Sequence, residues 1–191
     1  ILYFSDQITL LKPNGESRTV WADIQSVKRS EFYAGLTAGV NLSNSFKIYS
    51  EEYMGEPALS FDGRFYMVER VYSGGSDWTE LNCSELNQKC LIRQRLRGGD
   101  GLENPRYSDW SVPVPCAVFI SGAMPQQVQD VKAGVLSADI DVKVTIMFRN
   151  IQPYDQLCIN KRYFEISYIK DIGLRGVWLE LYCKEVNAND A

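Results

Sequence analysis

The fold is decided by the stretch Asp62-Gly63-Arg64-Phe65-Tyr66-Met67-Val68-Glu69-Arg70-Val71-Tyr72-Ser73. It begins with Asp62-Gly63, a turn dipeptide, and continues with alternating apolar and polar side chains. A turn dipeptide followed by alternation with a period of two is typical of a hairpin strand with one buried face. The stretch therefore predicts a turn and a strand.

The chain contains this pattern a second time, in Asn160-Lys161-Arg162-Tyr163-Phe164-Glu165-Ile166-Ser167-Tyr168-Ile169-Lys170-Asp171. The segments around the two copies match as well. Residues 78–85 (WTELNCSE) correspond to residues 178–185 (WLELYCKE), and residues 46–49 correspond to residues 141–146. The pattern indicates two tandem copies of one small β-rich domain, which we place at residues 1–86 and 87–191.

The spacing between equivalent residues grows along the repeat. Lys47 is matched with Lys143, Arg64 with Arg162 and Cys83 with Cys183, so that the offset rises from 96 to 98 and then to 100. Small insertions in loops between matched strands produce such a drift.

Each copy is expected to run strand, strand, short helix and then three or four antiparallel strands. Ser30 is the expected N-cap of a helix over Glu31–Leu36, and the second copy has its helix at Pro125–Ala133. The predicted fold class is mainly β, with two tandem small antiparallel β-barrel or sandwich domains. One short helix is inserted after the second strand of each domain.

Three further strand predictions bear on the surface of these domains. The first copy should have a strand over Phe46–Tyr53, after a polar linker at residues 37–45. In the second copy we expect strands over Leu91–Arg97 and Val114–Ile120. Pro113 and Pro115 imply an edge position for the last of these.

Composition and charge narrow the class of protein. The 191 residues are 45% hydrophobic and 23% charged, which is ordinary for a globular chain, and no apolar run approaches the roughly 20 residues of a membrane span. No membrane partner is expected.

Residues 1–86 hold 7 Lys and Arg against 12 Asp and Glu, whereas residues 87–191 hold 13 against 12. The two copies are therefore expected to face different neighbours.

The five cysteines form no C-x-x-C motif, and their number is odd. Cys83 and Cys183 occupy equivalent alternating positions, where a small apolar side chain suits a core. This pattern favours buried reduced thiols over a disulfide framework.

Catalysis has little support in the sequence. The chain has no histidine, which removes the commonest general base and metal ligand. It also lacks a nucleophile elbow, a phosphate-binding loop and a dinucleotide fingerprint. Asp139 and Asp141 share a strand face, but no further oxygen ligands cluster beside them. We predict no enzyme activity, no metal and no cofactor.

The most distinctive charged feature is a basic stripe formed by Lys89, Arg93, Arg95 and Arg97. A spacing of two on a strand places the three arginines on one face. They could contact DNA phosphates without reading the base sequence. Alternatively, they form a charged face that keeps an exposed edge strand from pairing with other chains.

Aromatic residues are abundant, and most lie in alternating strands at positions repeated between the two copies. Core packing explains this pattern, and a platform that stacks bases or sugars is the alternative. The residues are Tyr33, Tyr49, Tyr53, Phe65, Tyr66, Tyr72, Trp78, Tyr163, Phe164, Tyr168 and Trp178.

Two stretches of the first copy resemble the head–tail connector proteins of tailed bacteriophages, also called head-closure or head–tail adaptor proteins. They are Val20-Trp21-Ala22-Asp23-Ile24-Gln25-Ser26-Val27-Lys28-Arg29-Ser30-Glu31-Phe32-Tyr33 and, later in the chain, residues 62–66. Residues 126–129 and 151–155 of the second copy are similar to corresponding stretches of that family. The resemblance covers most of the chain and carries no catalytic residues. Family members usually have one domain, so the tandem arrangement is a departure.

The resemblance implies small β-barrels with a helix after the second strand, assembled into a ring of 6 or 12 copies in the neck of the virion. A portal or adaptor protein would bind on the head side, and a tail terminator or tail-tube protein on the tail side. Double-stranded DNA would contact the lumen non-specifically, and assembly would take place in the host bacterial cytoplasm. The alternative function is a β-barrel binding module for a sugar or single-stranded nucleic acid.

The loops at residues 37–45 and 98–109 are expected to become ordered only against neighbouring proteins in such a ring. They carry the candidate assembly residues Asn41, Asn44, Gly99, Asp100 and Asn104.

Overall fold

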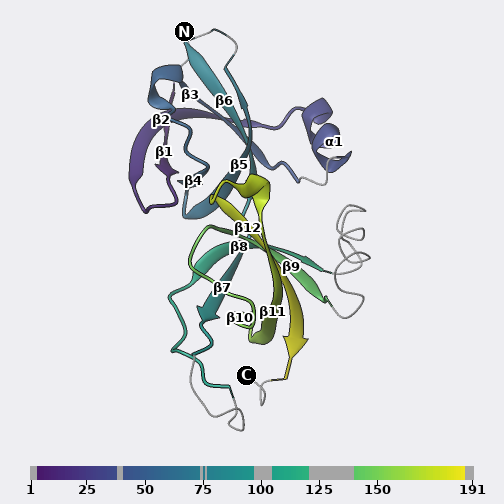
Figure 1. Ribbon diagram of the computed structural model, residues 1–191. Helices are drawn as coiled ribbons and strands as arrows, with labels where there is room; N and C mark the ends of the chain where they lie inside the picture. Colours follow the sequence, from purple (N-terminus) through teal and green to yellow (C-terminus); the bar gives the residue numbers. More distant parts are fainter. Residues whose placement is uncertain are drawn as a thin grey trace. The chain divides into compact units, whose positions relative to one another are not determined.

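The computed structural model of the protein describes residues 4–37, 41–73, 75, 77–96, 105–120 and 140–187. The chain divides into two compact units, Ile1–Leu86 and Asn87–Ala191, and the strands of each unit wrap into an antiparallel barrel (Figure 1). Among the described residues, no helix is long and apolar enough to span a membrane.

The first unit is a closed six-stranded barrel with the strand order β1-β2-β3-β6-β5-β4. The barrel closes because β4 pairs with β1, where Leu59 lies opposite Leu10. Its elements are β1 (Asp6–Leu11), β2 (Ser17–Ser26), α1 (Arg29–Thr37), β3 (Asn44–Tyr49), η1 (Ser50–Glu52), β4 (Ala58–Phe61), β5 (Arg64–Tyr72) and β6 (Trp78–Glu85).

The second unit is a closed six-stranded barrel of the same topology. Read from β7, its strand order is β7-β8-β9-β12-β11-β10, which matches β1-β2-β3-β6-β5-β4 of the first barrel strand by strand. The pairing of β10 with β7 closes the barrel. The predicted fold class is confirmed, with barrels rather than sandwiches. The elements are β7 (Gln88–Arg93), β8 (Val114–Ile120), β9 (Val142–Met147), β10 (Gln156–Ile159), β11 (Arg162–Asp171), η2 (Ile172–Leu174) and β12 (Trp178–Val186).

The helix of the first barrel follows β2 directly, as predicted. It begins at Arg29, so that Ser30 lies inside its first turn and the predicted N-cap is displaced. The second predicted helix, Pro125–Ala133, lies outside the described residues.

The strand registers correct one equivalence in the repeat. In both barrels a bulge interrupts the same hairpin, after Val68 in β5 and after Ile166 in β11. The ladders place Lys47 opposite Glu80 in the first barrel and Thr145 opposite Glu180 in the second. The counterpart of Lys47 is therefore Thr145, and the predicted match with Lys143 is wrong by two residues.

Two strand predictions also need correction. β3 runs over Asn44–Tyr49 and is followed by the 3-10 turn η1, so the predicted strand Phe46–Tyr53 extends too far. β8 is not an edge strand, because it pairs with both β7 and β9. Pro115 lies opposite Lys89 in the β7–β8 ladder but just before the β8–β9 ladder, which begins at Cys116, so its missing N–H falls outside the second of these ladders.

The turns that open the repeated hairpins share one backbone geometry. Both central residues have positive φ, at 49° and 72° for Asp62 and Gly63 and at 50° and 64° for Asn160 and Lys161. This is the signature of a type I′ turn, whose twist suits a two-residue hairpin and which prefers Asn or Asp followed by Gly. Lys161 thus occupies a position where glycine is preferred.

Replacing Lys161 by glycine is expected to raise the free energy of unfolding of the second barrel by about 0.5–1 kcal/mol, because a side chain is unfavourable at positive φ. The reverse change, Gly63→Lys, should cost a similar amount in the first barrel. Denaturant unfolding measures both changes. Lys161→Ala is the control and should be close to neutral, and an equal gain with alanine would exclude backbone strain as the cause.

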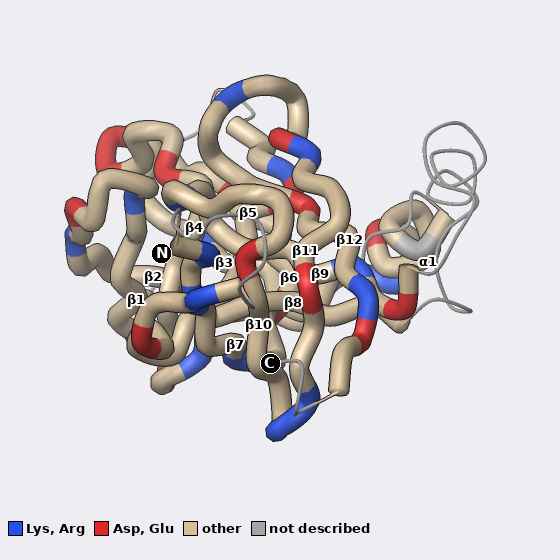
Figure 2. Tube along the Cα trace, turned by 60° about the horizontal axis from the view of Figure 1, so that its bottom comes forward, with Lys and Arg blue, Asp and Glu red and all other residues tan. Residues whose placement is uncertain are grey.

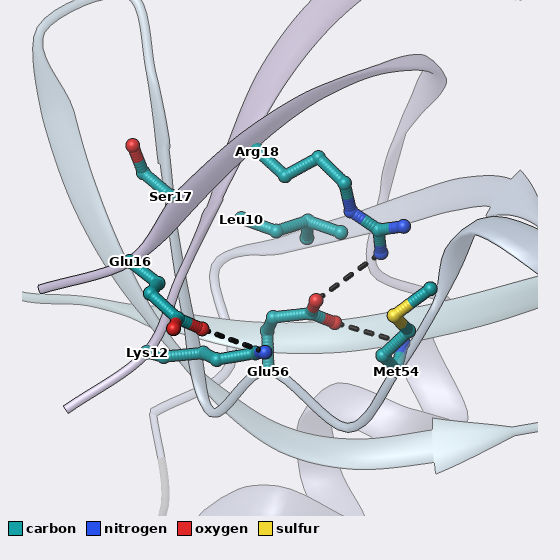
Figure 3. Close-up of a pocket in the computed structure, with 7 residues that line it drawn as sticks. All are labelled: Leu10, Lys12, Glu16, Ser17, Arg18, Met54 and Glu56. Carbon is teal, nitrogen blue, oxygen red and sulfur yellow. Dashed lines mark hydrogen bonds and ion pairs between the residues drawn. The ribbon is translucent and has the colours of Figure 1, made fainter. Parts of the chain in front are cut away.

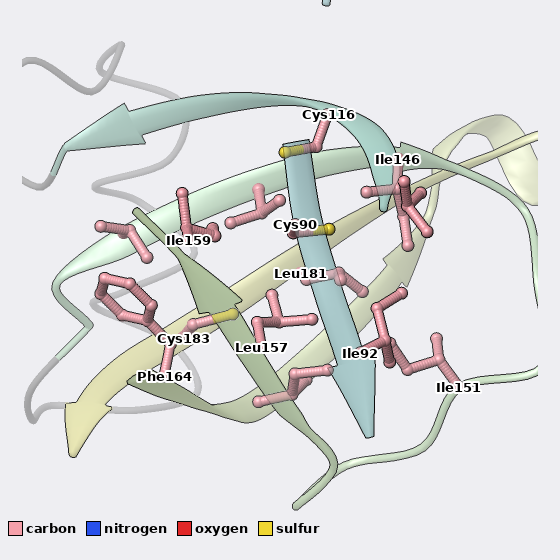
Figure 4. Packing of buried hydrophobic residues seen from close by; sticks show 14 of the residues in the cluster. Cys90, Ile92, Cys116, Ile146, Ile151, Leu157, Ile159, Phe164, Leu181 and Cys183 are labelled. Atoms are coloured by element: carbon pink, nitrogen blue, oxygen red, sulfur yellow. The ribbon is translucent and has the colours of Figure 1, made fainter. Parts of the chain in front are cut away.

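Each barrel encloses its own apolar core. In the second barrel, the side chains of Cys90 and Ile92 on β7 lie among those of Leu157 and Leu181 from other strands (Figure 4). In the first barrel, Phe46 and other buried residues form a separate cluster. The two clusters share no residue among those described.

The cysteines predicted to lie in the core do so. Cys83 and Cys183 are fully buried at equivalent positions in β6 and β12, and burial raises the pKa of both thiols. All five cysteines are free, and Cys158 is partly exposed. The small apolar thiol therefore serves here as a packing group.

Candidate interaction surfaces

The basic stripe begins on the outer wall of the second barrel. Lys89 and Arg93 alternate along β7 with the buried residues Cys90 and Ile92, so both point away from the core. β7 ends at Arg93, which shortens the predicted strand Leu91–Arg97. Because β7 pairs with β8 on one side and β10 on the other, it has no free edge for the arginines to protect.

Arg93 is enclosed by neighbouring side chains. Its Nε and Nη2 atoms both donate to Oε1 of Gln156, at 2.9 and 2.5 Å. Its guanidinium carbon lies 4.5 Å from the ring centroid of Tyr107 and 4.5 Å from that of Trp110. These contacts give Arg93 a structural role on the barrel wall.

The aromatic cover of Arg93 comes from the segment that precedes β8. The amide of Ser111 donates to the carbonyl of Ile92 at 2.8 Å, and the amide of Ser108 donates to that of Gln94 at 2.9 Å. Burial raises the pKa of Tyr107, although the charges of Arg95 and Arg93 partly oppose the shift. The segment therefore continues the β7 ladder beyond the end of the strand.

Arg95 is held through its backbone, while its side chain is exposed. Its amide donates to Oδ1 of the buried Asp155 at 2.8 Å, and the other carboxylate oxygen accepts from the amide of Gln152 at 2.7 Å. The guanidinium carbon lies 5.4 Å from the ring centroid of the exposed Tyr154. Lys89 and Arg95 are thus the exposed cations of the stripe that the structure describes, since Arg97 lies outside the described residues.

The predicted assembly residues are only partly described. Asn41 is exposed in the connection that precedes β3. Asn44 is the first residue of β3, opposite Cys83, and so belongs to the barrel wall rather than to a loop. Gly99, Asp100 and Asn104 lie outside the described residues, as does Asp139 of the weighed carboxylate pair. Asp141, its other member, accepts the amide of Glu185 at 2.7 Å.

A pocket of about 300 Å³ opens at one end of the first barrel (Figure 3). We call it the Leu10 pocket, after a residue of its apolar part. Glu56 lies at its centre, where it accepts from Arg18 at 3.1 Å and from the amide of Met54 at 2.9 Å. Lys12 and Glu16 form an ion pair at 3.0 Å. The lining residues are Leu10, Lys12, Glu16, Ser17, Arg18, Met54 and Glu56.

Helix α1 presents aromatic side chains to solvent. Tyr33 is 60% exposed, and Phe32 stacks edge-on against it at 5.8 Å between ring centroids. Glu31 tethers the helix to β5 through contacts of 3.4 Å with Arg70 and with the hydroxyl of Tyr72. Of the aromatic residues weighed from the sequence, Tyr66, Phe164 and Trp178 are buried, whereas Tyr33, Tyr49 and Tyr72 are exposed.

Sequence reasoning missed the hairpin tip between β11 and β12, which we define as residues 171–176. Leu174 there is 90% exposed and has a φ of 54°. Both carboxylate oxygens of Asp171 accept from the amide of Gly176, at 3.1 and 2.9 Å, and one accepts from the amide of Arg175 at 3.2 Å. The only signal in the sequence is the length of this hairpin, which exceeds that of its counterpart between β5 and β6 by two residues.

Within the described part of the chain, no group of three or more His, Cys, Asp and Glu side chains could hold a metal ion. Acidic and basic residues are interspersed along the described trace (Figure 2). Neither a protein-family model nor a curated protein sequence matches this chain.

Proposed function

We propose that the protein is a structural component of the neck of a tailed bacteriophage. Copies would form a ring that joins the portal of the DNA-filled head to the tail and closes or lines the DNA channel. The observation that carries the proposal is the position of α1, directly after β2 of a small closed barrel. That is the domain architecture implied by the resemblance of residues 20–33 and 62–66 to head–tail connector proteins.

The surfaces of both barrels support an assembled state. Each barrel interior is filled by side chains, whereas large apolar side chains stand exposed on the outside. Examples are Trp21 and Tyr33 in the first barrel and Ile120 and Leu174 in the second. Exposed apolar groups of this size are typical of surfaces that a partner covers. Six copies would supply twelve barrels, which would match a twelvefold portal to a sixfold tail.

Contact with DNA would fall to Lys89 and Arg95 on the second barrel. Both side chains are exposed, and residues 87–191 carry a small net positive charge while residues 1–86 are acidic. Two cations per copy, repeated around a ring, would touch phosphates without selecting a base sequence.

A binding module for single-stranded nucleic acid is the second candidate, favoured by one observation. The exposed ring of Tyr154 lies beside the exposed guanidinium of Arg95. An aromatic face next to a cation is what base stacking on a backbone-binding groove requires. The small size of this pair places the candidate behind the neck role.

The test is symmetry-resolved electron microscopy of phage particles that contain this chain. We expect density for both barrels in a closed ring between portal and tail, with six or twelve copies. Particles made without the protein should lose their DNA or fail to join tails, and supplying the full chain should restore them. Absence of the protein from particles, together with binding of single-stranded oligonucleotides by the purified chain, would favour the second candidate.

A further inference from the structure

The hairpin tip holds Leu174 in an unfavourable backbone conformation and leaves its side chain exposed. A leucine with a φ of 54° is disfavoured by its Cβ, and its side chain is 90% exposed. Asp171 fixes the backbone by accepting the amides of Arg175 and Gly176. An exposed apolar side chain on a strained backbone that hydrogen bonds hold in place points to a role in contact with another molecule.

The Leu10 pocket offers a surface of matching size on the first barrel. Its volume of about 300 Å³ can accommodate a leucine side chain. The exposed Met54 supplies apolar surface, and the fully buried Leu10 also lines the pocket.

The charges of the two surfaces are complementary as well. In the lining, Glu16 and Glu56 are paired with Lys12 and Arg18, so the excess of negative charge at the rim comes from η1. The exposed Glu51 of η1 lies beside the pocket, because the carbonyl of Glu52 in η1 accepts from Arg18 of the lining. The hairpin tip presents the exposed cation Arg175. The carboxylate of Asp171 also carries a negative charge, but it is turned toward the backbone amides of Arg175 and Gly176 in the tip.

We propose that Leu174 of one copy of this chain inserts into the Leu10 pocket of a neighbouring copy, with Arg175 against the acidic rim. Leu174 and the pocket lie on different barrels, so the contact is head-to-tail. Contacts of this kind build a ring when the rotation closes and a filament when it does not. The inference supplies the contact by which the proposed ring closes, and in that sense rests on the proposed function.

The first test is sedimentation velocity of the purified full chain over a wide range of concentrations. We expect concentration-dependent self-association, weakened about tenfold or more by Leu174→Gly. Glycine removes the side chain and also relieves the positive φ, so this variant should unfold at the same temperature or higher. Val112→Gly is the matched control, because Val112 is 80% exposed on the same unit but belongs to the segment before β8. It should leave association unchanged.

The second test uses complementation between two defective chains. Ser17→Trp adds bulk at the exposed rim of the pocket, and Thr19→Trp, two residues along the same strand, adds the same bulk outside the lining. Alone, the Leu174→Gly and Ser17→Trp chains should remain monomeric, whereas the Thr19→Trp chain should associate like the wild type. Mixed, the two defective chains should form a heterodimer and nothing larger, because each supplies the surface that the other lacks.

A wild-type chain that stays monomeric at every concentration would overturn the proposal, as would association that Leu174→Gly leaves unchanged. These outcomes are separate from those for the proposed function. If the chain associates through Leu174 but is absent from phage particles, the contact stands and the neck role fails. If the chain forms a ring in particles but Leu174→Gly assembles normally, the neck role stands and the contact is wrong.

Discussion

Replacing Lys143 by alanine is expected to lower the free energy of unfolding of the second barrel by about 3 kcal/mol, at the low end of the cost of breaking a buried ion pair. Lys143 points outward from β9 yet is only 7% exposed. Its Nζ donates to Oε1 of Glu180 at 2.9 Å and lies 4.7 Å from the ring centroid of Phe119. Alanine would leave the Glu180 side chain, 15% exposed, with the hydrogen bond from the Tyr182 hydroxyl at 3.1 Å and the weaker contact to Lys170 at 3.6 Å.

The matched control is Lys12→Ala, which removes an ion pair of nearly the same length from an exposed position. Lys12 and Glu16 are 3.0 Å apart, but both side chains face solvent. Water screens such a pair, so the loss should be close to the limit of measurement. Denaturant unfolding of the two variants compares the costs. Equal losses would show that burial adds nothing to the Lys143–Glu180 pair.

The pH dependence of the same pair has a defined sign. Burial acts to raise the pKa of Glu180, but the hydrogen bond and charge of Lys143, with Lys170 and Tyr182, outweigh it and the pKa is lowered. A carboxyl whose pKa is lower in the folded than in the unfolded state stabilises the fold at pH values above its unfolded-state pKa, which is about 4. That contribution is lost as the pH falls through the pKa of the folded state. The cost of Lys143→Ala should therefore shrink as the pH falls from neutral to below the ordinary range of a glutamate.

The parts of the fold that the sequence predicts are those set by local patterns. Asp62-Gly63 and Asn160-Lys161 mark turns by residue type alone, and the alternation after them assigns the buried face. The same alternation places Cys83 and Cys183 in the cores. The predicted match of Lys47 with Lys143 is wrong because residue type alone does not fix the register of a strand. Identical residues at positions two apart on the same strand face look equivalent in a sequence, and only the ladder decides which strand position they share.

The candidate surfaces depend on contacts between distant segments, which local patterns do not contain. The spacing of Arg93 and Arg95 predicts a shared face but cannot show that Tyr107 and Trp110 enclose only the first. The edge position that Pro115 implied for β8 is ruled out only by the pairing of that strand with both β7 and β9. Leu174 becomes a candidate contact residue only once its positive φ is known.

The two barrels should unfold as separate cooperative units, which equivalent core substitutions can show. Leu81 and Leu181 are fully buried in separate clusters, at matching positions of β6 and β12. Each Leu→Ala change is expected to cost about 3 kcal/mol, within the range of about 2–5 for buried leucines, because it removes apolar contacts and leaves a cavity.

Calorimetry of the full chain measures where each cost appears. Since each barrel closes its own hydrogen-bond ladder around its own core, Leu81→Ala should lower one transition and Leu181→Ala the other. Val112→Ala, at an exposed site, is the control and should change neither transition measurably. If both core variants instead shifted one common transition, the barrels would be energetically coupled and the chain would unfold as a single unit. Separate transitions would mean that damage to one barrel leaves the other folded.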